Sequence, residues 1–163
     1  MNKKTVRALI EAAKRARLKA YCPYSRYPIG AAVLTDSGRI FPGANVENAS
    51  YGLTICGERT AVANAVTHGE KSLTAVCVVG KSPRPCGACR QFMIEFSTKD
   101  TWLYIVDLGG DGRRESVNRT RVFAMLPGAF DPLEAGLLPR NPTNLLKRRS
   151  RKGAKRRARP ARR

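Results

Sequence analysis

The pattern of apolar and polar positions divides most of the chain into helices and strands. Residues 3–20 carry apolar side chains at helical spacing, with Leu9 and Ala13 on one face and basic residues on the other. Further helices are predicted at residues 56–69 and 86–96, with a short one in 120–128 that Pro127 ends. Strands are predicted at residues 28–35, 39–46, 73–80 and 101–108, with a weaker one at 113–118. This order of elements indicates a layered α/β domain with helices packed on a central sheet.

Size and charge suggest one domain followed by a basic tail. The 163 residues, 42% of them hydrophobic, suit a single domain with a substantial core. The net charge of +19 is uneven, because residues 141–163 contain eleven Lys and Arg and no acid. Such a segment cannot bury enough apolar surface to offset its ordering entropy. We expect a domain over residues 1–140 and a disordered tail over 141–163, with nucleic-acid binding by the tail as an optional property.

The apolar runs are too short to span a membrane. The best, LTAVCVVG at residues 73–80, falls well below the length of about 20 residues that a spanning helix needs. The first 21 residues are basic but lack the apolar block of a secretory signal, so we expect them to form a helix. An odd number of cysteines, five, favours free thiols over disulfides. We expect a cytoplasmic protein with no membrane partner.

Three cysteines stand where two predicted helices begin. Cys86 and Cys89 are spaced as Pro-Cys-x-x-Cys, and Cys56 opens the helix predicted upstream. The free N–H groups and the dipole at a helix start stabilise a thiolate. Two helix starts on one sheet can lie side by side, so that three thiolates could bind one Zn²⁺. A redox pair would use Cys86 and Cys89 alone and would leave Cys56 without a role.

The number of available ligands favours catalytic zinc over structural zinc. Structural zinc sites usually have four protein ligands, whereas catalytic sites leave one position for water. The remaining candidates are poor, since Cys77 lies in a buried strand, Cys22 in a loop, and His68 near the far end of its helix. We therefore expect three protein ligands and one open position.

Glu58 gives this site a proton carrier. It lies two residues after Cys56, in the first turn of the same predicted helix, where a carboxylate can reach a water without ligating the metal. The plain alternative is a helix-start carboxylate favoured by the dipole. Cys-x-Glu, followed 30 residues after the first cysteine by Pro-Cys-x-x-Cys, is the zinc deaminase signature with cysteine in place of histidine.

The chain resembles the small cytidine deaminases that bind zinc through three cysteines. The similarity covers about residues 5–131 and rests on the separated motifs AYCPYSRYPIGAAV, GANVENASYG, TICGERTAVANA, PCGACRQ and MLPGAF. It implies a three-layer α/β/α fold with a central mixed sheet of about five strands, assembled as a homotetramer with shared active sites. The implied reaction is the hydrolytic deamination of free cytidine and deoxycytidine to uridine and deoxyuridine, a step of pyrimidine salvage.

The resemblance also implies roles for the residues around the zinc. By position, Cys56, Cys86 and Cys89 match the zinc ligands. Glu58 matches the residue that moves protons between water and the cytosine ring. Arg59 matches an arginine that bonds to the zinc thiolates, and a guanidinium there would offset the net negative charge of three thiolates on Zn²⁺.

Further matches concern the nucleoside. Asn45 and Glu47 match residues that hold the ribose 3′ hydroxyl, which needs both a donor and an acceptor. Tyr51 matches a residue that contacts substrate across a subunit interface. Phe130 matches an aromatic residue that reaches a neighbouring subunit's pocket and stacks on the base.

Two positions depart from the usual residue of this family. Tyr27 stands where phenylalanine usually faces the nucleoside, so its hydroxyl needs a polar partner. Gly57 replaces an alanine whose backbone N–H faces the pyrimidine carbonyl, and glycine can keep that contact. The segment before Pro85 is shorter than expected, which could alter the rim of the pocket.

Three other functions stay open at this point. The first is deamination of cytosine within RNA or DNA, which the basic tail suggests, although a carboxylate such as Glu47 near the sugar would repel a 3′ phosphate. The second is deamination of a cytosine-like antibiotic, by an enzyme not expected to carry both NVENASY and LPGAF. The third is a nucleic-acid-binding protein with structural zinc, which needs a fourth ligand and has no use for Glu58.

Overall fold

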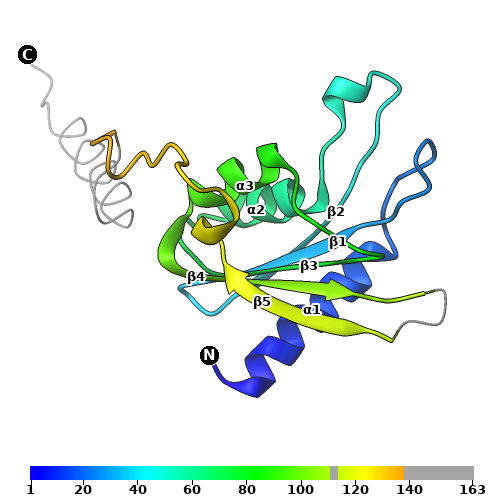
Figure 1. Cartoon of the computed structure of the whole chain (residues 1–163), viewed down its shortest axis with the longest axis horizontal. Helices are drawn as coiled ribbons and strands as arrows, with labels where there is room; N and C mark the ends of the chain where they lie inside the picture. The colour runs from blue at the N-terminus through cyan, green and yellow to red at the C-terminus, as the bar shows by residue number, and fades with distance from the viewer. Residues whose placement is uncertain (111–113, 138–163) are drawn as a thin grey trace, which may run out of the picture. The chain divides into compact units, whose positions relative to one another are not determined.

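The computed structural model describes residues 1–110 and 114–137 (Figure 1). Residues 1–129 form one compact unit, and a second unit begins at Phe130. The expected basic tail and the domain boundary expected at residue 140 lie outside the described residues. No helix in the described part of the chain is long and apolar enough to cross a membrane.

Five strands form one mixed sheet in the order β2-β1-β3-β4-β5. The strands are β1 (Gly30–Thr35), β2 (Ile40–Ala44), β3 (Leu73–Gly80), β4 (Ser97–Asp107) and β5 (Ser116–Arg121). The helices are α1 (Lys3–Arg17), α2 (Gly57–Thr67) and α3 (Gly87–Ile94), with short 3₁₀ helices η1 (Tyr51–Leu53) and η2 (Phe123–Met125). β3 and β4 are parallel and are connected through α3, while the other neighbouring strands are antiparallel. The expected mixed sheet is confirmed.

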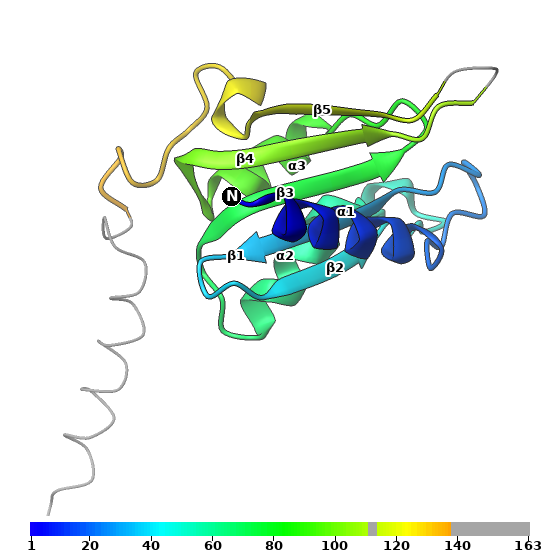
Figure 2. The same cartoon turned by 90° about the horizontal axis from the view of Figure 1, so that it is seen from below.

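The side chains of each central strand alternate between two hydrophobic cores. On one face of the sheet, Cys77 of β3 packs in a cluster with Leu9 of α1. On the other face, Val78 packs in a cluster with Val62 of α2 and Met93 of α3. Figure 2 shows α1 on one side of the sheet and the other two helices on the opposite side. The domain therefore has the expected three layers, α/β/α.

The elements differ from the sequence-based predictions mainly at their ends. α1 begins after Asn2, whose Oδ1 accepts from the Thr5 backbone N–H at 2.8 Å, and ends at Arg17, three residues earlier than predicted. β1 begins at Gly30 and not at residue 28, because the N–H of the preceding residue donates to the side chain of Asn45. β4 begins earlier than predicted and β5 later, since both follow the register of the neighbouring strands.

Two glycines let the helices approach the sheet closely. A Cβ on Gly43 of β2 would lie 2.2 Å from the backbone nitrogen of Ala61 in α2. A Cβ on Gly30 of β1 would lie 2.1 Å from the carbonyl oxygen of Ala13 in α1. Both distances are shorter than any non-bonded contact allows, so only glycine fits at these positions. Gly43 thereby holds α2 tightly against the edge strand.

One end of the sheet brings the starts of α2 and α3 together. Gly30, at the start of β1, pairs with Ala44 at the end of β2 and with Val79 near the end of β3. α2 follows the long loop after β2, α3 follows the short loop after β3, and the two helices contact each other (Figure 1). The loops before both helices therefore converge at this end.

Candidate metal centre

Three cysteine thiols meet where α2 and α3 begin. Cys56 is the N-cap of α2, Cys86 is the N-cap of α3, and Cys89 lies in the first turn of α3. The Sγ atom of Cys86 lies 3.9 Å from that of Cys56 and 3.4 Å from that of Cys89. All three Sγ atoms lie within 4.8 Å of one another. Two separate helices thus supply one sulfur cluster.

The spacing of the sulfur atoms fits a zinc ion. Tetrahedral Zn–S bonds of about 2.3 Å place the sulfur atoms about 3.8 Å apart. The observed separations of 3.4 and 3.9 Å are close to that value. Among the described residues, this cluster is the one group of His, Cys, Asp or Glu side chains that could hold a metal, and it has three members.

The other sulfur and imidazole side chains lie elsewhere. Cys77 is buried on the α1 face of the sheet, and burial raises the pKa of its thiol to about 12. His68 follows the last turn of α2, where its Nδ1 lies 2.8 Å from the carbonyl oxygen of Asn64. Cys22 lies in the loop after α1, and all five cysteines are free thiols.

The pKa values of two of the clustered thiols, Cys56 and Cys89, are shifted in opposite directions. The pKa of Cys56 is lowered to about 5, first by a hydrogen bond from the Cys89 thiol and also by the Arg59 guanidinium. The same hydrogen bond, together with burial, raises the pKa of Cys89. The helix starts further favour negative charge at the cluster. One thiolate is therefore available at neutral pH even before a metal binds.

Glu58 lies beside the cluster, in the first turn of α2. Glu58 is only 3% exposed, and it lines a cavity of about 210 Å³ together with Cys56 and Cys86. Burial raises the pKa of Glu58 to about 7, and the negative Cys56 adds to the rise. A carboxyl group with such a pKa can take up and release a proton near neutral pH.

The cavity connects the thiol cluster with the loops after α1 and after β2. It is lined by Ser25, Tyr27, Ile29, Asn45, Glu47, Thr54, Cys56, Glu58, Val78, Arg84 and Cys86. The structure thus brings Tyr27, Asn45 and Glu47 into one cavity with Cys56 and Glu58.

Asn45 and Tyr27 are fixed by backbone groups. Asn45 is 8% exposed, its Oδ1 accepts from the N–H of Ile29 at 2.9 Å, and its Nδ2 donates to the carbonyl of Tyr27 at 3.0 Å. One N–H of this amide stays available to another acceptor. The hydroxyl of Tyr27 donates to the carbonyl of Lys81 at 2.6 Å, which is the polar partner that this hydroxyl needs.

Glu47 is held by the loop that precedes β1. Its carboxylate accepts from the hydroxyl and the backbone N–H of Ser25, and from the backbone N–H of Tyr24 at 2.9 Å. The bond from the Ser25 hydroxyl and the two backbone bonds lower the pKa of Glu47. Glu47 therefore carries a negative charge at neutral pH, in the same cavity lining as Cys56 and Cys86.

Gly57 and Arg59 lie within the first turn of α2. A Cβ on Gly57 would lie 3.3 Å from the carbonyl oxygen of Ile29, so alanine would fit there only with a small shift. The Nη2 of Arg59 donates to the carbonyl of Thr54 at 2.8 Å and lies 4.0 Å from the Sγ of Cys56. Arg59 thus reaches both the sulfur cluster and the loop before it.

Of the residues expected to contact the nucleoside, Tyr51 does not line this cavity. Tyr51 of η1 is 73% exposed, and its ring centroid lies 5.8 Å from that of Tyr24. Phe130 is the first residue of the second unit. In that unit, Asp131 accepts through its Oδ1 from the N–H of Leu133 at 2.9 Å, which closes a short turn. The roles expected for Tyr51 and Phe130 stay predictions.

Sequence reasoning missed five residues of the cavity lining, of which three are polar: Ser25, Thr54 and Arg84. Ser25 and Thr54 lie inside recognised motifs, but a loop serine or threonine has no pattern of its own. Arg84 had a usable signal, because its flanking residues Pro83 and Pro85 restrict the backbone and so fix where its side chain starts.

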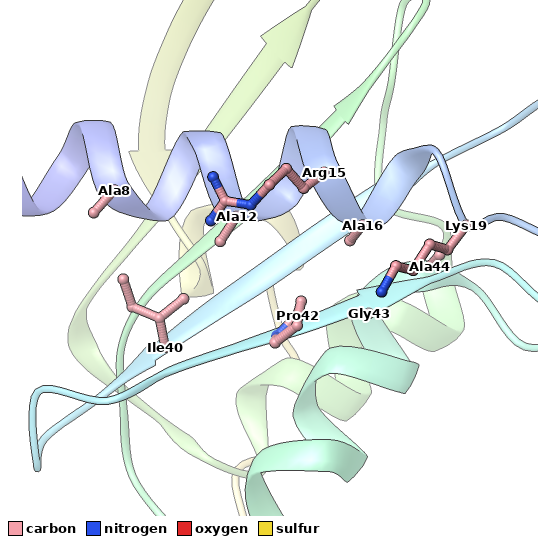
Figure 3. A pocket seen from close by; sticks show the side chains of 9 residues that line it. All are labelled: Ala8, Ala12, Arg15, Ala16, Lys19, Ile40, Pro42, Gly43 and Ala44. Carbon is pink, nitrogen blue, oxygen red and sulfur yellow. The ribbon is translucent and has the colours of Figure 1, made fainter.

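A larger pocket, of about 480 Å³, lies away from the sulfur cluster, between α1 and β2 (Figure 3). It is lined by Ala8, Ala12, Arg15, Ala16, Lys19, Ile40, Pro42, Gly43 and Ala44. This lining offers no thiol, carboxylate or hydroxyl, so it lacks both the possible metal ligands and the carboxyl groups of the smaller cavity. The smaller cavity beside the cysteines is therefore the candidate active site.

Known proteins share both the fold and the motif that builds this site. Residues 3–105 match the family model described as the cytidine and deoxycytidylate deaminase zinc-binding region. A cytidine deaminase of Halalkalibacterium halodurans is 47% identical over 125 residues, which cover 75% of this chain and 91% of that protein. A probable cytidine deaminase of Dictyostelium discoideum is 43% identical and covers 80% of this chain and 86% of its own length.

Solved structures give the same result. The crystal structure of cytidine deaminase from Burkholderia pseudomallei is 45% identical, covers 80% of this chain and all of that chain, and superposes with a TM-score of 0.70. The enzyme from Mycobacterium tuberculosis is 38% identical, with a TM-score of 0.64. The chain therefore belongs to the zinc-binding cytidine and deoxycytidylate deaminase family, and its three-cysteine cluster is able to hold the zinc ion.

Proposed function

We propose that this protein is a zinc-dependent hydrolase that converts free cytidine and deoxycytidine to uridine and deoxyuridine with release of ammonia. The observation that carries this proposal is the buried carboxyl group of Glu58 beside three thiols from two helix starts, in one cavity. Family membership supports the same reaction, whose usual role is pyrimidine salvage.

Cys56, Cys86 and Cys89 are the residues that would hold the zinc ion, since their sulfur spacing fits its bond lengths. Zinc in such a site supplies a water molecule of lowered pKa as the nucleophile. Arg59, 4.0 Å from the Sγ of Cys56, offsets part of the negative charge that the thiolates concentrate there.

Glu58 does the proton work in this proposal. Its carboxylate takes a proton from the attacking water as the C4–O bond forms, and it donates that proton to N3 of the ring. In the second half, Glu58 moves the proton of the new C4 hydroxyl group to the amine, and the C4–N bond breaks as the C4=O bond forms, so that water and cytidine become ammonia and uridine. Its pKa of about 7 suits a group that must accept and donate in turn.

The rest of the cavity suits a free nucleoside. Asn45 and Glu47 would hold the ribose hydroxyl, with a donor from the amide and an acceptor from the carboxylate. Gly57 would offer its backbone N–H to the pyrimidine carbonyl, and Tyr27 would pack along the nucleoside. A phosphate on the sugar beside Glu47 would meet an ionised carboxylate, which disfavours cytosine within a nucleic-acid strand.

The same proposal includes assembly of the protein as a homotetramer with shared active sites. Large apolar side chains near the cavity mouth are exposed in the single chain, among them Tyr24, Tyr51, Leu53 and Ile55. Such a patch is typical of a surface that a second copy covers. Tyr51 and Phe130 would then act across subunit boundaries. Free thiols at the metal centre need a reducing compartment, which favours the cytoplasm.

The decisive experiment is a cytidine turnover assay, followed by the loss of ultraviolet absorbance, on protein of known zinc content. We expect turnover of cytidine and deoxycytidine, one zinc ion per chain, loss of turnover with a chelator, and recovery on adding zinc. Zinc-loaded protein that leaves both nucleosides intact would overturn the proposal. Preferential deamination of a cytosine-containing antibiotic or of an RNA oligonucleotide would replace the substrate that we propose.

A further inference from the structure

Arg90 in α3 binds two backbone carbonyl groups at once. Its Nε donates to the carbonyl of Pro85 at 2.8 Å, and its Nη1 donates to the carbonyl of Met125 at 2.8 Å. Pro85 directly precedes Cys86, whereas Met125 lies in η2. One guanidinium therefore ties the loop that presents a metal ligand to η2, in which Met125 lies 35 residues after Arg90.

Cys86 depends on its loop more than the other two cysteines do. It is exposed, whereas Cys56 is partly buried and Cys89 is buried within α3. As the N-cap of α3, Cys86 has an extended backbone, and its side chain makes no capping hydrogen bond. Its Sγ contacts the other two thiols, but neither burial nor a capping bond adds to the support of this side chain.

The hydrogen bond to Pro85 supplies that support. A peptide unit is planar, so fixing the carbonyl of Pro85 also fixes the nitrogen of Cys86 on the other side of the same unit. The bond to Met125 uses a second nitrogen of the same rigid guanidinium plane, which prevents the side chain from rotating away. The direction of the Cys86 Sγ is then left with few rotamers.

The other end of this loop is anchored as well. The backbone N–H of Ser82 donates to Oδ1 of Asp107 at 2.8 Å, and Pro83 and Pro85 are both buried. Each proline ring fixes one backbone torsion. The loop is thus a stiff connection between β3 and Cys86, with Asp107 at one end and Arg90 at the other.

The loop before Cys56 has a similar support from its own helix. Arg59 donates to the carbonyl of Thr54, two residues before Cys56. The two arginines differ in one respect, since Arg59 also lies 4.0 Å from the Sγ of Cys56, whereas both bonds described for Arg90 end on carbonyl oxygens. Arg90 therefore acts on the metal site through the backbone and not through a thiolate.

We propose that Arg90 is a positioning residue for the zinc centre, which fixes the Cys86 thiolate through the Pro85 carbonyl and couples it to η2 through the Met125 carbonyl. The inference rests on the three-cysteine zinc site and is independent of which cytosine compound the enzyme accepts. Residues that orient metal ligands from outside the ligand shell typically change metal affinity by about 10- to 100-fold.

The test measures zinc affinity of folded protein, by competition with a chromophoric chelator. Arg90→Gln removes both charged hydrogen bonds and is expected to weaken zinc binding about 10- to 100-fold. Arg90→Lys keeps the charge, but one ammonium group cannot replace the planar fork that spans two carbonyls, so a smaller loss is expected. The cobalt-substituted variants should also show a changed thiolate-to-metal absorption band, because a displaced Cys86 alters the bonding of its sulfur.

Arg121→Gln is the matched control. Arg121 also donates to a backbone carbonyl, that of Asp100, but on β5 and not beside a metal ligand. It should keep wild-type zinc affinity and an unchanged cobalt spectrum. If Arg90→Gln is folded by circular dichroism and also keeps both properties, Arg90 has only a structural role and the proposal is wrong. If Arg90→Gln does not fold, wild-type affinity in Arg90→Lys has the same meaning.

The outcome can be separated from that of the proposed reaction. A wild-type protein that binds zinc but does not turn over cytidine would overturn the proposed substrate and leave the comparison of zinc affinities intact. Normal cytidine turnover together with wild-type affinity in the Arg90 variants would overturn the role of Arg90 alone.

Discussion

The pKa of a cysteine thiol is shifted in opposite directions on the two faces of the sheet. On the α1 face, Cys77 is surrounded by apolar side chains, and burial raises the pKa of its thiol to about 12. At the helix starts on the other face, Cys56 has a donor thiol from Cys89 and a guanidinium from Arg59, and its pKa is lowered to about 5. The environment at the helix starts, and not the residue type, therefore decides which thiol is ready for a metal.

The difference extends beyond the cysteines. The α1 face is closed by alanine, aliphatic and aromatic side chains, and the side chains that line the large pocket along its edge are apolar or basic. The face covered by α2 and α3 ends in loops whose polar side chains, such as Asn45 and Glu47, hold backbone groups around a cavity. One layer stabilises the fold, and the end of the other layer supplies reactive groups.

The largest effect is expected when the cavity beside the thiols loses Glu58, the carboxyl group that carries a proton. Glu58→Gln keeps the size of the side chain but cannot carry a proton, so we expect turnover of cytidine to fall by about 10²- to 10⁴-fold. Zinc content should stay at the wild-type level. The control is Glu70→Gln, which changes another buried carboxylate, one held by Ser37 and Arg39 away from the cavity. Glu70→Gln should keep turnover, and more than a tenth of wild-type turnover in Glu58→Gln would contradict the role of Glu58.

The second prediction compares the loss of one cysteine from each face of the sheet. Cys89→Ala removes a ligand and should abolish stoichiometric zinc binding, measured as metal per chain after gel filtration. Cys77→Ala should keep zinc and turnover and lower the free energy of unfolding by about 1 kcal/mol, because it leaves a small void in the core. Equal zinc content in the two variants would contradict the inference that the cysteines at the helix starts bind zinc and Cys77 does not.

The third prediction concerns thiol reactivity in zinc-free protein. At pH 7, Cys56 should be alkylated readily, because pH 7 lies above its pKa of about 5 and its thiolate predominates. The rate should fall as the pH is lowered through about 5, while Cys77 should stay unmodified throughout. Peptide mass spectrometry would identify the modified residue, and added zinc should protect Cys56. A rate that rises only above pH 8 would indicate an ordinary thiol.

The sequence predicted the sulfur cluster because its signals are local. A cysteine at a helix start is visible from the pattern around Cys56 and Cys86. Strand and helix periodicity indicates helices packed on a central sheet, whereas the order of the three layers was implied by the family resemblance. The contacts that close the cavity are not local. The bond from Tyr27 to Lys81 joins residues 54 apart, and Arg90 reaches Met125 across 35 residues, so neither follows from spacing.

Side chains that compete with the backbone also escaped prediction. Asn45 takes the N–H of Ile29, which shortens β1 at its start, although the apolar pattern continues through that position. The pattern reports which residues prefer burial, but it does not report which amide or hydroxyl intercepts a strand's hydrogen bonds. The ends of the strands, where the site lies, are for that reason the least predictable part of the fold.

The smallest predicted effect lies at the rim of the reactive side. Tyr27→Phe removes the hydroxyl that donates to the carbonyl of Lys81, and a net loss of about 0.5–1.5 kcal/mol in unfolding free energy is expected. The aromatic ring, which lines the cavity, is kept, so kcat/KM for cytidine should change by less than about tenfold. Tyr24→Phe, in the same loop, is the control for removing a tyrosine hydroxyl. A larger loss of kcat/KM in Tyr27→Phe, but not in Tyr24→Phe, would mean that the Tyr27 hydroxyl binds substrate. This hydroxyl would then belong to the substrate-binding groups of the loop and not only to its structural contacts.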